Sequence, residues 1–304
     1  MTDTVIRLIS EIVTASMVRI NEPMSRHTTF KIGGSADLLA EPSNMNQAEA
    51  LVKLLKQINI PYIVIGNGSN ILVGDKGIRG VVIKIGNQFS AVTADDSIIT
   101  ACAGIKLSRL ANMACGNCLT GLEFAAGIPG TLGGALYMNA GAYGGEMKQV
   151  VKSVTYIDSQ GIRRTIDARD CAFGYRSSLF MTDPGCVILG CTIELTEGNP
   201  DNIKAQMNEL SAKRIEKQPL NFPSAGSTFK RPEGAFAGKL IQDSGLMGAR
   251  VGGASVSEKH AGFIINDKGA TAADVRALIS MVQKKVKEDS GYELMPEVRF
   301  IGEF

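Results

Sequence analysis

The longest stretch without a charged side chain, residues 124–145, limits what this chain can fold into more than any other segment. It is long enough to cross a membrane, but it holds seven glycines and Pro129 and few of the Leu, Ile and Val residues of a spanning helix. Glycines permit positive φ and a close approach to the main chain. The segment therefore predicts loop or buried backbone that contacts something large and partly apolar. Tight packing of turns against a helix is the alternative interpretation.

A second glycine-rich segment, residues 66–70, reads Gly-Asn-Gly-Ser-Asn and lies between the apolar runs 62–65 and 71–73. Backbone N–H groups of such a loop can point together at one anion. A simple hairpin turn explains the same residues, because Gly and Asn are common there. Neither segment fits the dinucleotide fingerprint GxGxxG between a strand and a helix, and neither contains the GxxxxGK[ST] phosphate loop.

Composition indicates an ordinary folded chain of two or three domains, with 304 residues, 44% hydrophobic and 20% charged. A net charge of +2 gives no support to a nucleic-acid or membrane-surface role. Six cysteines without a secretory signal predict reduced thiols in a cytoplasmic protein. Cys115 and Cys118 have CxxC spacing but close a predicted helix instead of opening one, which disfavours a redox role. Two histidines are too few for a histidine-based metal site.

Apolar periodicity predicts an α+β chain. Capping residues mark the starts of two helices. One begins at Pro200 with Asn199 as its N-cap, and the other begins after the cap Thr271-x-x-Asp274. The predicted helices are residues 4–16, 46–57, 106–116, 200–217, 235–243 and a last one from 271. The predicted strands are residues 62–65, 71–73, 81–85, 97–103, 150–158, 162–166, 187–195, 250–255, 263–266 and 294–301.

Three glycine motifs occur in an order that resembles the UDP-N-acetylenolpyruvoylglucosamine reductase family. They are Thr29-Phe-Lys-x-Gly-Gly34, Ile65-Gly-x-Gly-Ser-Asn-x-Leu72, and Gly127-Ile-Pro-Gly-x-x-Gly-Gly134 with Met138-Asn-x-Gly-Ala142. The resemblance implies a flavin-binding fold of the vanillyl-alcohol-oxidase-like type with two α+β subdomains, residues 1–90 and 91–205, and a substrate domain, residues 206–304. It implies non-covalent FAD, with NADPH as hydride donor. The residues implied to bind FAD are Gly66, Asn67, Gly68, Ser69, Asn70, Gly127, Ile128, Pro129, Gly130, Gly133, Gly134, Ala135, Asn139, Gly141 and Ala142.

Three further motifs resemble the catalytic part of that family: Phe173-Gly-Tyr-Arg176, Ala225-Gly-Ser-x-Phe-Lys230 and Pro296-Glu-Val298. The implied reaction reduces an enol ether that carries a carboxylate. Arg176 would bind that carboxylate and steady the developing enolate. Ser227 would deliver the proton that quenches the carbanion. Glu297 would act beside Arg176 through a hydrogen bond that strengthens as charge moves.

Positive and aromatic side chains near these motifs are the implied contacts to a UDP-sugar: Tyr175, Arg214, Lys217, Lys230 and Arg231. Arg231 stands where many relatives carry asparagine. The short stretch between residues 174 and 200 resembles the subclass without a substrate-covering insertion, and Tyr175 is a candidate for part of the missing cover. A monomer or weak homo-oligomer is expected, without nucleic acid or stable membrane association. The remaining alternatives are another FAD-dependent oxidase of the same fold and a non-catalytic flavin or sugar-nucleotide binding protein.

Overall fold

The computed structural model describes all residues 1–304, and they form two compact units, each built from separate stretches of the chain. Unit 1 comprises Met1–Ile20, Leu38–Asn67 and Gly80–Lys213, and unit 2 comprises Asn21–Asp37, Gly68–Arg79 and Arg214–Phe304. The domain boundaries expected near residues 90 and 205 stay predictions. The structure adds that residues 21–37 and 68–79 belong to the same compact unit as the C-terminal part of the chain.

A four-stranded sheet has the order β1-β2-β5-β3, and β3 pairs with β5 in parallel. Its strands are β1 (Val18–Pro23), β2 (Ser35–Ala40), β5 (Ile78–Lys84) and β3 (Tyr62–Ile65). Helix α1 (Asp3–Ile12) packs on α2 (Met45–Gln57), and both bury their apolar stripes in the core of unit 1. The strands β1 and β2 were not expected from the sequence, because polar and apolar residues do not alternate regularly along either of them.

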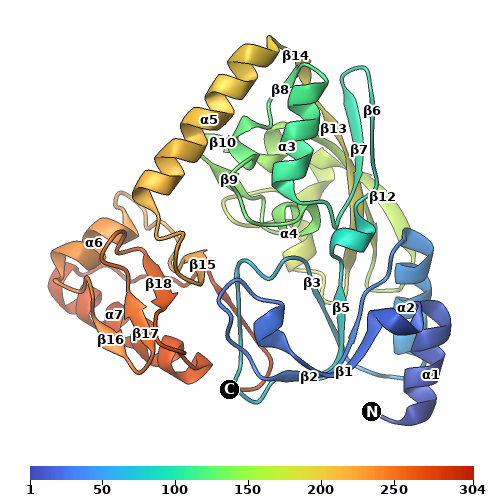
Figure 1. The fold of residues 1–304 in the computed structure, drawn as a ribbon, viewed down its shortest axis with the longest axis horizontal. Helices are drawn as coiled ribbons and strands as arrows, with labels where there is room; N and C mark the ends of the chain where they lie inside the picture. Colours follow the sequence, from blue (N-terminus) through green and yellow to red (C-terminus); the bar gives the residue numbers. More distant parts are fainter. The chain divides into compact units, whose positions relative to one another are not determined.

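Unit 1 contains a five-stranded antiparallel sheet in the order β12-β11-β13-β7-β6. Unit 1 also contains helices α3 (Leu107–Gly116) and α4 (Leu132–Tyr137) (Figure 1) and two short antiparallel strand pairs, the hairpin β9-β10 and the long-range pair β8-β14. The strands are β6 (Val92–Asp95), β7 (Ile98–Cys102), β8 (Leu119–Thr120), β9 (Gly141–Ala142), β10 (Gly145–Glu146), β11 (Val151–Ile157), β12 (Arg163–Asp167), β13 (Val187–Glu194) and β14 (Thr196–Glu197).

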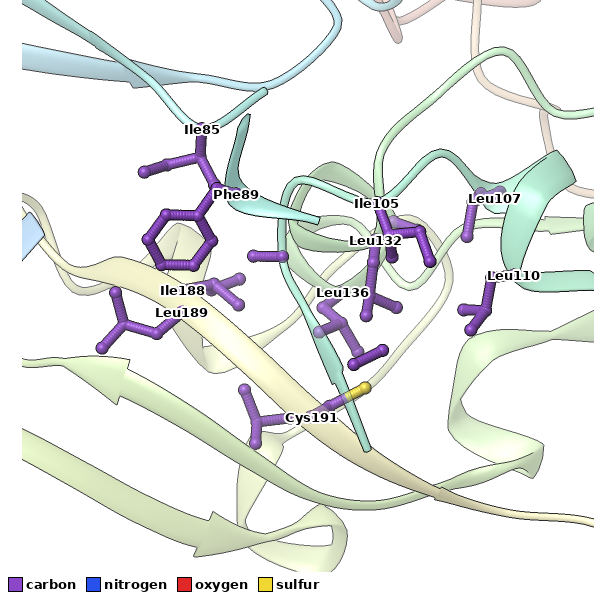
Figure 2. Close-up of a cluster of buried hydrophobic side chains, with 14 of the residues drawn as sticks. Ile85, Phe89, Ile105, Leu107, Leu110, Leu132, Leu136, Ile188, Leu189 and Cys191 are labelled. Carbon is purple, nitrogen blue, oxygen red and sulfur yellow. The ribbon is translucent and has the colours of Figure 1, made fainter. Parts of the chain in front are cut away.

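The short helix α4 corrects the expectation that residues 124–145 are only loop or turn. Leu132 and Leu136 of α4 are fully buried and lie with Ile105, Leu110 and Cys191 in one apolar cluster (Figure 2). The glycines kept this helix from being recognised, since Gly133 and Gly134 lower its propensity. Gly133 is needed for packing, because a Cβ there would lie 3.0 Å from the Cβ of Ala103.

Unit 2 is organised around an antiparallel sheet, β15-β18-β17-β16, on which α6 (Ala237–Asp243) and α7 (Ala272–Ser290) pack (Figure 1). The strands are β15 (Ser224–Ser227), β16 (Arg250–Val251), β17 (Ala254–Val256) and β18 (Phe263–Asn266). A separate parallel pair joins β4 (Ile71–Val73) to β19 (Arg299–Ile301). Helix α5 (Pro200–Lys217) confirms its predicted bounds, and its last turn begins the final stretch of unit 2.

Three sequence predictions about strands are wrong. Residues 66–70 do not form a hairpin turn, because β3 pairs with β5 while β4 pairs with β19. The expected strand over 294–301 is reduced to β19 and an isolated bridge between Pro296 and Phe229. The expected strand over 250–255 is a hairpin of β16 and β17, turned at Gly252, whose φ is +52°. Alternation of apolar residues could not reveal these breaks, because they depend on partners far away in the sequence.

No helix of the chain is both long enough and apolar enough to span a membrane.

Replacing Thr271 by Ala should cost about 1 kcal/mol of unfolding free energy, because its hydroxyl accepts from the N–H of Asp274. The Asp274 carboxylate accepts from the N–H of Thr271 in return, so the two residues form the capping box that the sequence predicts. Urea unfolding of the apoprotein, followed by circular dichroism, measures the effect. An unchanged midpoint and slope would show that the box does not hold the start of α7.

Candidate functional site

The two glycine-rich segments meet within unit 1. The Asn67 side chain donates a 2.6 Å hydrogen bond from Nδ2 to the carbonyl of Pro129. A Cβ on Gly66 would lie only 2.2 Å from Oγ1 of Thr131, so glycine is required at that position. The residues predicted separately to hold one cofactor are therefore neighbours. Gly127, Ile128, Pro129 and Gly130 lie in the loop before α4, and Gly133, Gly134 and Ala135 lie on α4 itself.

At this contact, the buried hydroxyl of Thr131 has no hydrogen-bond partner in the protein. The residue is 3% exposed. It occupies the N-cap position of α4 but makes no capping bond. A buried hydroxyl without a partner costs about 1–3 kcal/mol, so it is normally retained for a ligand or water. A phosphate oxygen suits it, which fits the diphosphate of FAD.

Not every glycine of the run is kept for a ligand. A Cβ on Gly141 would meet the carbonyl of Gly145 at 2.6 Å, and one on Gly145 would meet the ring of Phe124 at 2.5 Å. The tight-packing interpretation therefore accounts for part of the run. Gly134 differs, because a Cβ there would find only Oγ1 of Thr131, at 3.8 Å. The open side of α4 thus lies beside the unsatisfied hydroxyl.

Arg176 lies in a tight turn in unit 1, in the left-handed region with φ of +51°. Gly174 and Ser177 close this turn through paired backbone hydrogen bonds of 3.1 and 3.3 Å. The guanidinium donates to the carbonyl of Gly141 at 3.1 Å and lies 5.3 Å from the ring centre of Tyr175. A non-glycine residue with positive φ stores backbone strain, and such strain concentrates at functional sites. The turn thereby fixes one predicted catalytic side chain beside Tyr175, a predicted substrate contact.

Ser227 ends strand β15 in unit 2, where it is exposed, and its neighbour Thr228 is buried. Thr228 anchors the strand, since its N–H donates to the carbonyl of Gly262 and its hydroxyl accepts from the N–H of Ile264. Gly226 has φ of +76° and no atom near its Cβ position. The serine therefore lies on a strand that is fixed by hydrogen bonds. It follows Gly226, whose positive φ is a backbone conformation that favours glycine.

Glu297 is fixed directly beside this strand. Its N–H donates to the carbonyl of Thr228 at 2.8 Å, and its own carbonyl accepts from Nδ2 of Asn70 at 3.2 Å. Asn70 also accepts from the N–H of Arg299 through its carbonyl. The serine motif, the glutamate motif and the end of the first glycine loop are thus one hydrogen-bonded assembly inside unit 2.

Thr29, which the sequence placed in a glycine motif without a role of its own, links the first glycine loop to the serine strand. Its N–H donates to the carbonyl of Gly68 at 3.1 Å, and its hydroxyl donates to the carbonyl of Ser224 at 2.7 Å. Gly68 has φ of +64°, and a Cβ there would lie 2.0 Å from the carbonyl oxygen of His27. Sequence pattern could not assign this role, because Thr29 and Ser224 meet only through folding.

His260 supports the serine strand as a neutral side chain. Burial lowers the pKa of its imidazole, which keeps the ring uncharged near neutrality. Its Nδ1 then accepts from the N–H of Gly262, the residue whose carbonyl holds Thr228. The other histidine, His27, is buried and bonded to Glu22 at 2.9 Å. The structure brings no group of three His, Cys, Asp or Glu side chains together as a metal site.

The four basic residues predicted to bind the substrate all belong to unit 2. Lys217 ends α5 and is exposed, and Arg214 lies one turn earlier. The guanidinium of Arg231 stacks 4.0 Å from the ring centre of Phe236, which is 60% exposed. The backbone of Lys230 is fixed by a hydrogen bond to Met295. An aromatic ring and several cations on one unit suit a nucleotide with a diphosphate.

Replacing Thr131 by Val should separate cofactor binding from folding. Because the hydroxyl has no partner, the apoprotein should keep its stability or gain up to about 1 kcal/mol. FAD affinity should fall about 10-fold, as expected for losing one hydrogen bond to a charged group. Flavin titration and urea unfolding of the apoprotein measure the two effects. Unchanged FAD affinity would exclude the hydroxyl from the cofactor site.

Two family models match parts of the chain, and reductases of known bacteria match almost all of it. Residues 36–167 match the FAD binding domain, and residues 218–301 match the C-terminal domain of UDP-N-acetylenolpyruvoylglucosamine reductase. The chain is 50% identical to the UDP-N-acetylenolpyruvoylglucosamine reductase of Caldanaerobacter subterraneus, covering 100% of both chains. It is 49% identical to that of Clostridioides difficile, covering 94% of both chains.

Solved structures extend the likeness to the fold. The chain superposes on UDP-N-acetylenolpyruvylglucosamine reductase from Thermus caldophilus with a TM-score of 0.78 and 32% identity, covering 93% of this chain and 97% of that one. An alkyldihydroxyacetonephosphate synthase matches with a TM-score of 0.51 and 16% identity over 65% of this chain and 41% of that one, a likeness of fold alone. The predicted FAD-binding fold with an added C-terminal substrate domain is confirmed.

Proposed function

Because the chain belongs to the UDP-N-acetylenolpyruvoylglucosamine reductase family, we propose that it reduces the enolpyruvyl double bond of UDP-N-acetylglucosamine enolpyruvate to give UDP-N-acetylmuramate for peptidoglycan synthesis. NADPH is the hydride donor, through non-covalently bound FAD. The observation that carries the proposal is that the serine, glutamate and first glycine motifs meet in unit 2. There the N–H of Glu297 donates to the carbonyl of Thr228, the neighbour of Ser227, and the carbonyl of Glu297 accepts from Nδ2 of Asn70.

FAD, when bound, supplies the hydride that is added to the terminal vinyl carbon. The residues that fit its diphosphate are those around the unsatisfied hydroxyl: Gly66, Asn67, Thr131 and Gly134. Their backbone and neutral side chains offer hydrogen bonds without adding a charge beside the flavin.

Arg176 binds the substrate carboxylate. Hydride addition leaves negative charge on the carbon that carries this carboxylate, and the charge spreads into it as an enolate. A planar guanidinium can donate two parallel hydrogen bonds to the two oxygens, and these bonds strengthen as charge accumulates. Tyr175, beside it and 56% exposed, offers an apolar face to the substrate.

Ser227 protonates the carbon that carries the enolate charge, which completes the saturation of the double bond. Its exposed hydroxyl on a rigid strand suits a proton donor that must reach one carbon of a bound substrate. Glu297 is held on the neighbouring backbone. Because a bare carboxylate would repel the enolate, Glu297 stabilises this charge either as a protonated carboxyl that donates a hydrogen bond or through an intervening donor.

Arg214, Lys217, Lys230 and Arg231 bind the uridine diphosphate through charge-assisted hydrogen bonds. Arg231, stacked on Phe236, brings a delocalised cation where many relatives have a neutral amide. The chain works in the cytoplasm as a monomer or weak homo-oligomer, with the UDP-sugar as its binding partner and with neither nucleic acid nor membrane. The oxidase alternative lacks support, because His27 and His260 are both engaged in hydrogen bonds within the protein.

Anaerobic half-reactions test the proposal. NADPH should bleach the flavin absorbance, and the enolpyruvyl sugar nucleotide should then restore it without oxygen. A non-catalytic binding protein would bind both ligands and show no bleaching. An oxidase would be reoxidised by oxygen and not by the sugar nucleotide, so either result would overturn the proposed function.

A further inference from the structure

Two segments of unit 1, residues 137–141 and 174–178, are joined by three hydrogen bonds. Ser178 donates from Oγ to the carbonyl of Tyr137 at 2.6 Å, and Asn139 donates from Nδ2 to the carbonyl of Gly174 at 3.0 Å. Arg176 donates to the carbonyl of Gly141 at 3.1 Å. The segment 137–141, expected from sequence to contact the cofactor, is thus the support on which the arginine turn rests.

Asn139 is the middle of this support, and its side chain is fully buried. Its Nδ2 donates both to Gly174 and to the carboxylate of Glu146, the latter at 2.8 Å. Its Oδ1 accepts from the N–H of Lys148 at 2.9 Å. Both amide donors are therefore used inside the protein, and the side chain has no donor left for a diphosphate.

Backbone strain explains why such a support is needed. Asn139 and Arg176 both have positive φ, +44° and +51°, which non-glycine residues adopt only when their surroundings hold them there. Gly174 opens the turn that contains Arg176, and its carbonyl accepts from both Asn139 and Ser177. Loss of the Asn139 bond would remove the side-chain bond that holds the carbonyl of Gly174, at the start of the turn.

We propose that Asn139 is a positioning residue that holds the Gly174–Ser177 turn, and through it the guanidinium of Arg176, in the orientation that receives the substrate carboxylate. This inference rests on the proposed function for its catalytic consequence. Asn139 is among the residues that the sequence predicts to bind FAD, and the inference gives its side chain a role in the second half-reaction.

Asn139→Asp tests the inference, because it keeps the shape and replaces the amide donors by an oxygen. That oxygen faces the carbonyl of Gly174 and the carboxylate of Glu146, two acceptors that repel it. We expect FAD content and flavin reduction by NADPH to stay within about 2-fold of wild type. Flavin reoxidation by substrate should slow about 10- to 100-fold, the size expected when a catalytic group is misplaced. Asn112→Asp is the matched control, because Asn112 is exposed and bonds only within its own helix.

A double-mutant comparison separates positioning from a structural role. If Asn139 acts through Arg176, Asn139→Asp combined with Arg176→Ala should reoxidise as slowly as Arg176→Ala alone. Multiplied effects of the two substitutions would overturn the inference. So would a loss of FAD affinity that accounts for the whole defect, since that would return Asn139 to the cofactor site.

Hydrogen exchange at the turn gives a readout independent of activity. The amide hydrogens of Gly174 and Ser177 should exchange at least 10-fold faster in Asn139→Asp than in Asn112→Asp. This measurement decides the positioning role even if wild-type flavin is not reoxidised by the sugar nucleotide, a result that would refute the proposed function by itself. If Asn139→Asp does not fold, Asn139→Ser, which keeps one hydroxyl, should show the same pattern at smaller size. Unchanged exchange in the folded variant would overturn the inference.

Discussion

Ser227→Ala should lose flavin reoxidation by about 10²–10³-fold, the cost of removing one catalytic hydrogen-bonding group. The proton that completes the reduced product would then have to come from solvent. Flavin reduction by NADPH should be normal, because the serine strand is held by Thr228, whose bonds to Gly262 and Ile264 remain. Stopped-flow absorbance under anaerobic conditions measures the two half-reactions separately.

Ser290→Ala is the control for this variant. Ser290 is exposed at the end of α7 in the same unit, and its hydroxyl bonds only to nearby backbone, donating to the carbonyl of Val286 and accepting from the N–H of Tyr292. Both half-reactions should match wild type in the control. Normal turnover in Ser227→Ala would assign the proton to another group. Loss of both half-reactions together would show that the substitution disturbs the fold of unit 2 instead of one chemical step.

Local sequence signals predicted the elements whose determinants are local. Helix α5 begins at Pro200 with Asn199 accepting from two N–H groups of its first turn, and α7 begins with the Thr271 and Asp274 box. The core strands β11 and β13 were equally clear, because both are rich in Val, Ile and Thr and are bounded by turn residues.

Features that depend on distant partners were missed. The chain enters unit 2 three times, and no composition change marks the stretches 21–37 and 68–79 that belong to it. The first glycine loop resembled a hairpin because the partners of β3 and β4 are β5 and β19, outside any local window. Helix α4 was hidden by glycines that its packing on Ala103 requires.

The candidate site shows the same division. Motif order identified Arg176, Ser227 and Glu297 as candidates. The structure bonds the backbone of Glu297 to Thr228, the neighbour of Ser227, and to the side chain of Asn70. Pattern could not give the supporting residues, because Thr131, Thr29 and Asn139 act through partners that only the fold supplies. The candidate catalytic residues thus lie in motifs that the sequence reveals. The residues that position them have no such motif and are found only from the structure.

Arg176→Lys should reduce the rate of flavin reoxidation by substrate about 10²–10³-fold, although the positive charge is kept. A single ammonium cannot donate two parallel bonds to a carboxylate, and it also cannot keep the bond from Nη2 to Gly141 while facing the substrate. The backbone should tolerate the change, since lysine at φ of +51° carries the same strain as arginine. Reduction by NADPH and FAD content should therefore be normal.

Arg109→Lys provides the matched control, because Arg109 is exposed on α3 and its guanidinium bonds to Ser90. Substrate affinity distinguishes the two parts of the arginine's role. Binding of a carboxylate in the ground state predicts weaker affinity in Arg176→Lys, whereas stabilisation of the enolate predicts a slower step at saturating substrate. We expect the slower step to dominate, because the charge on the carboxylate grows as the hydride is transferred. A variant with wild-type affinity and a wild-type rate would remove Arg176 from the site and leave the strain of its turn without a functional reason.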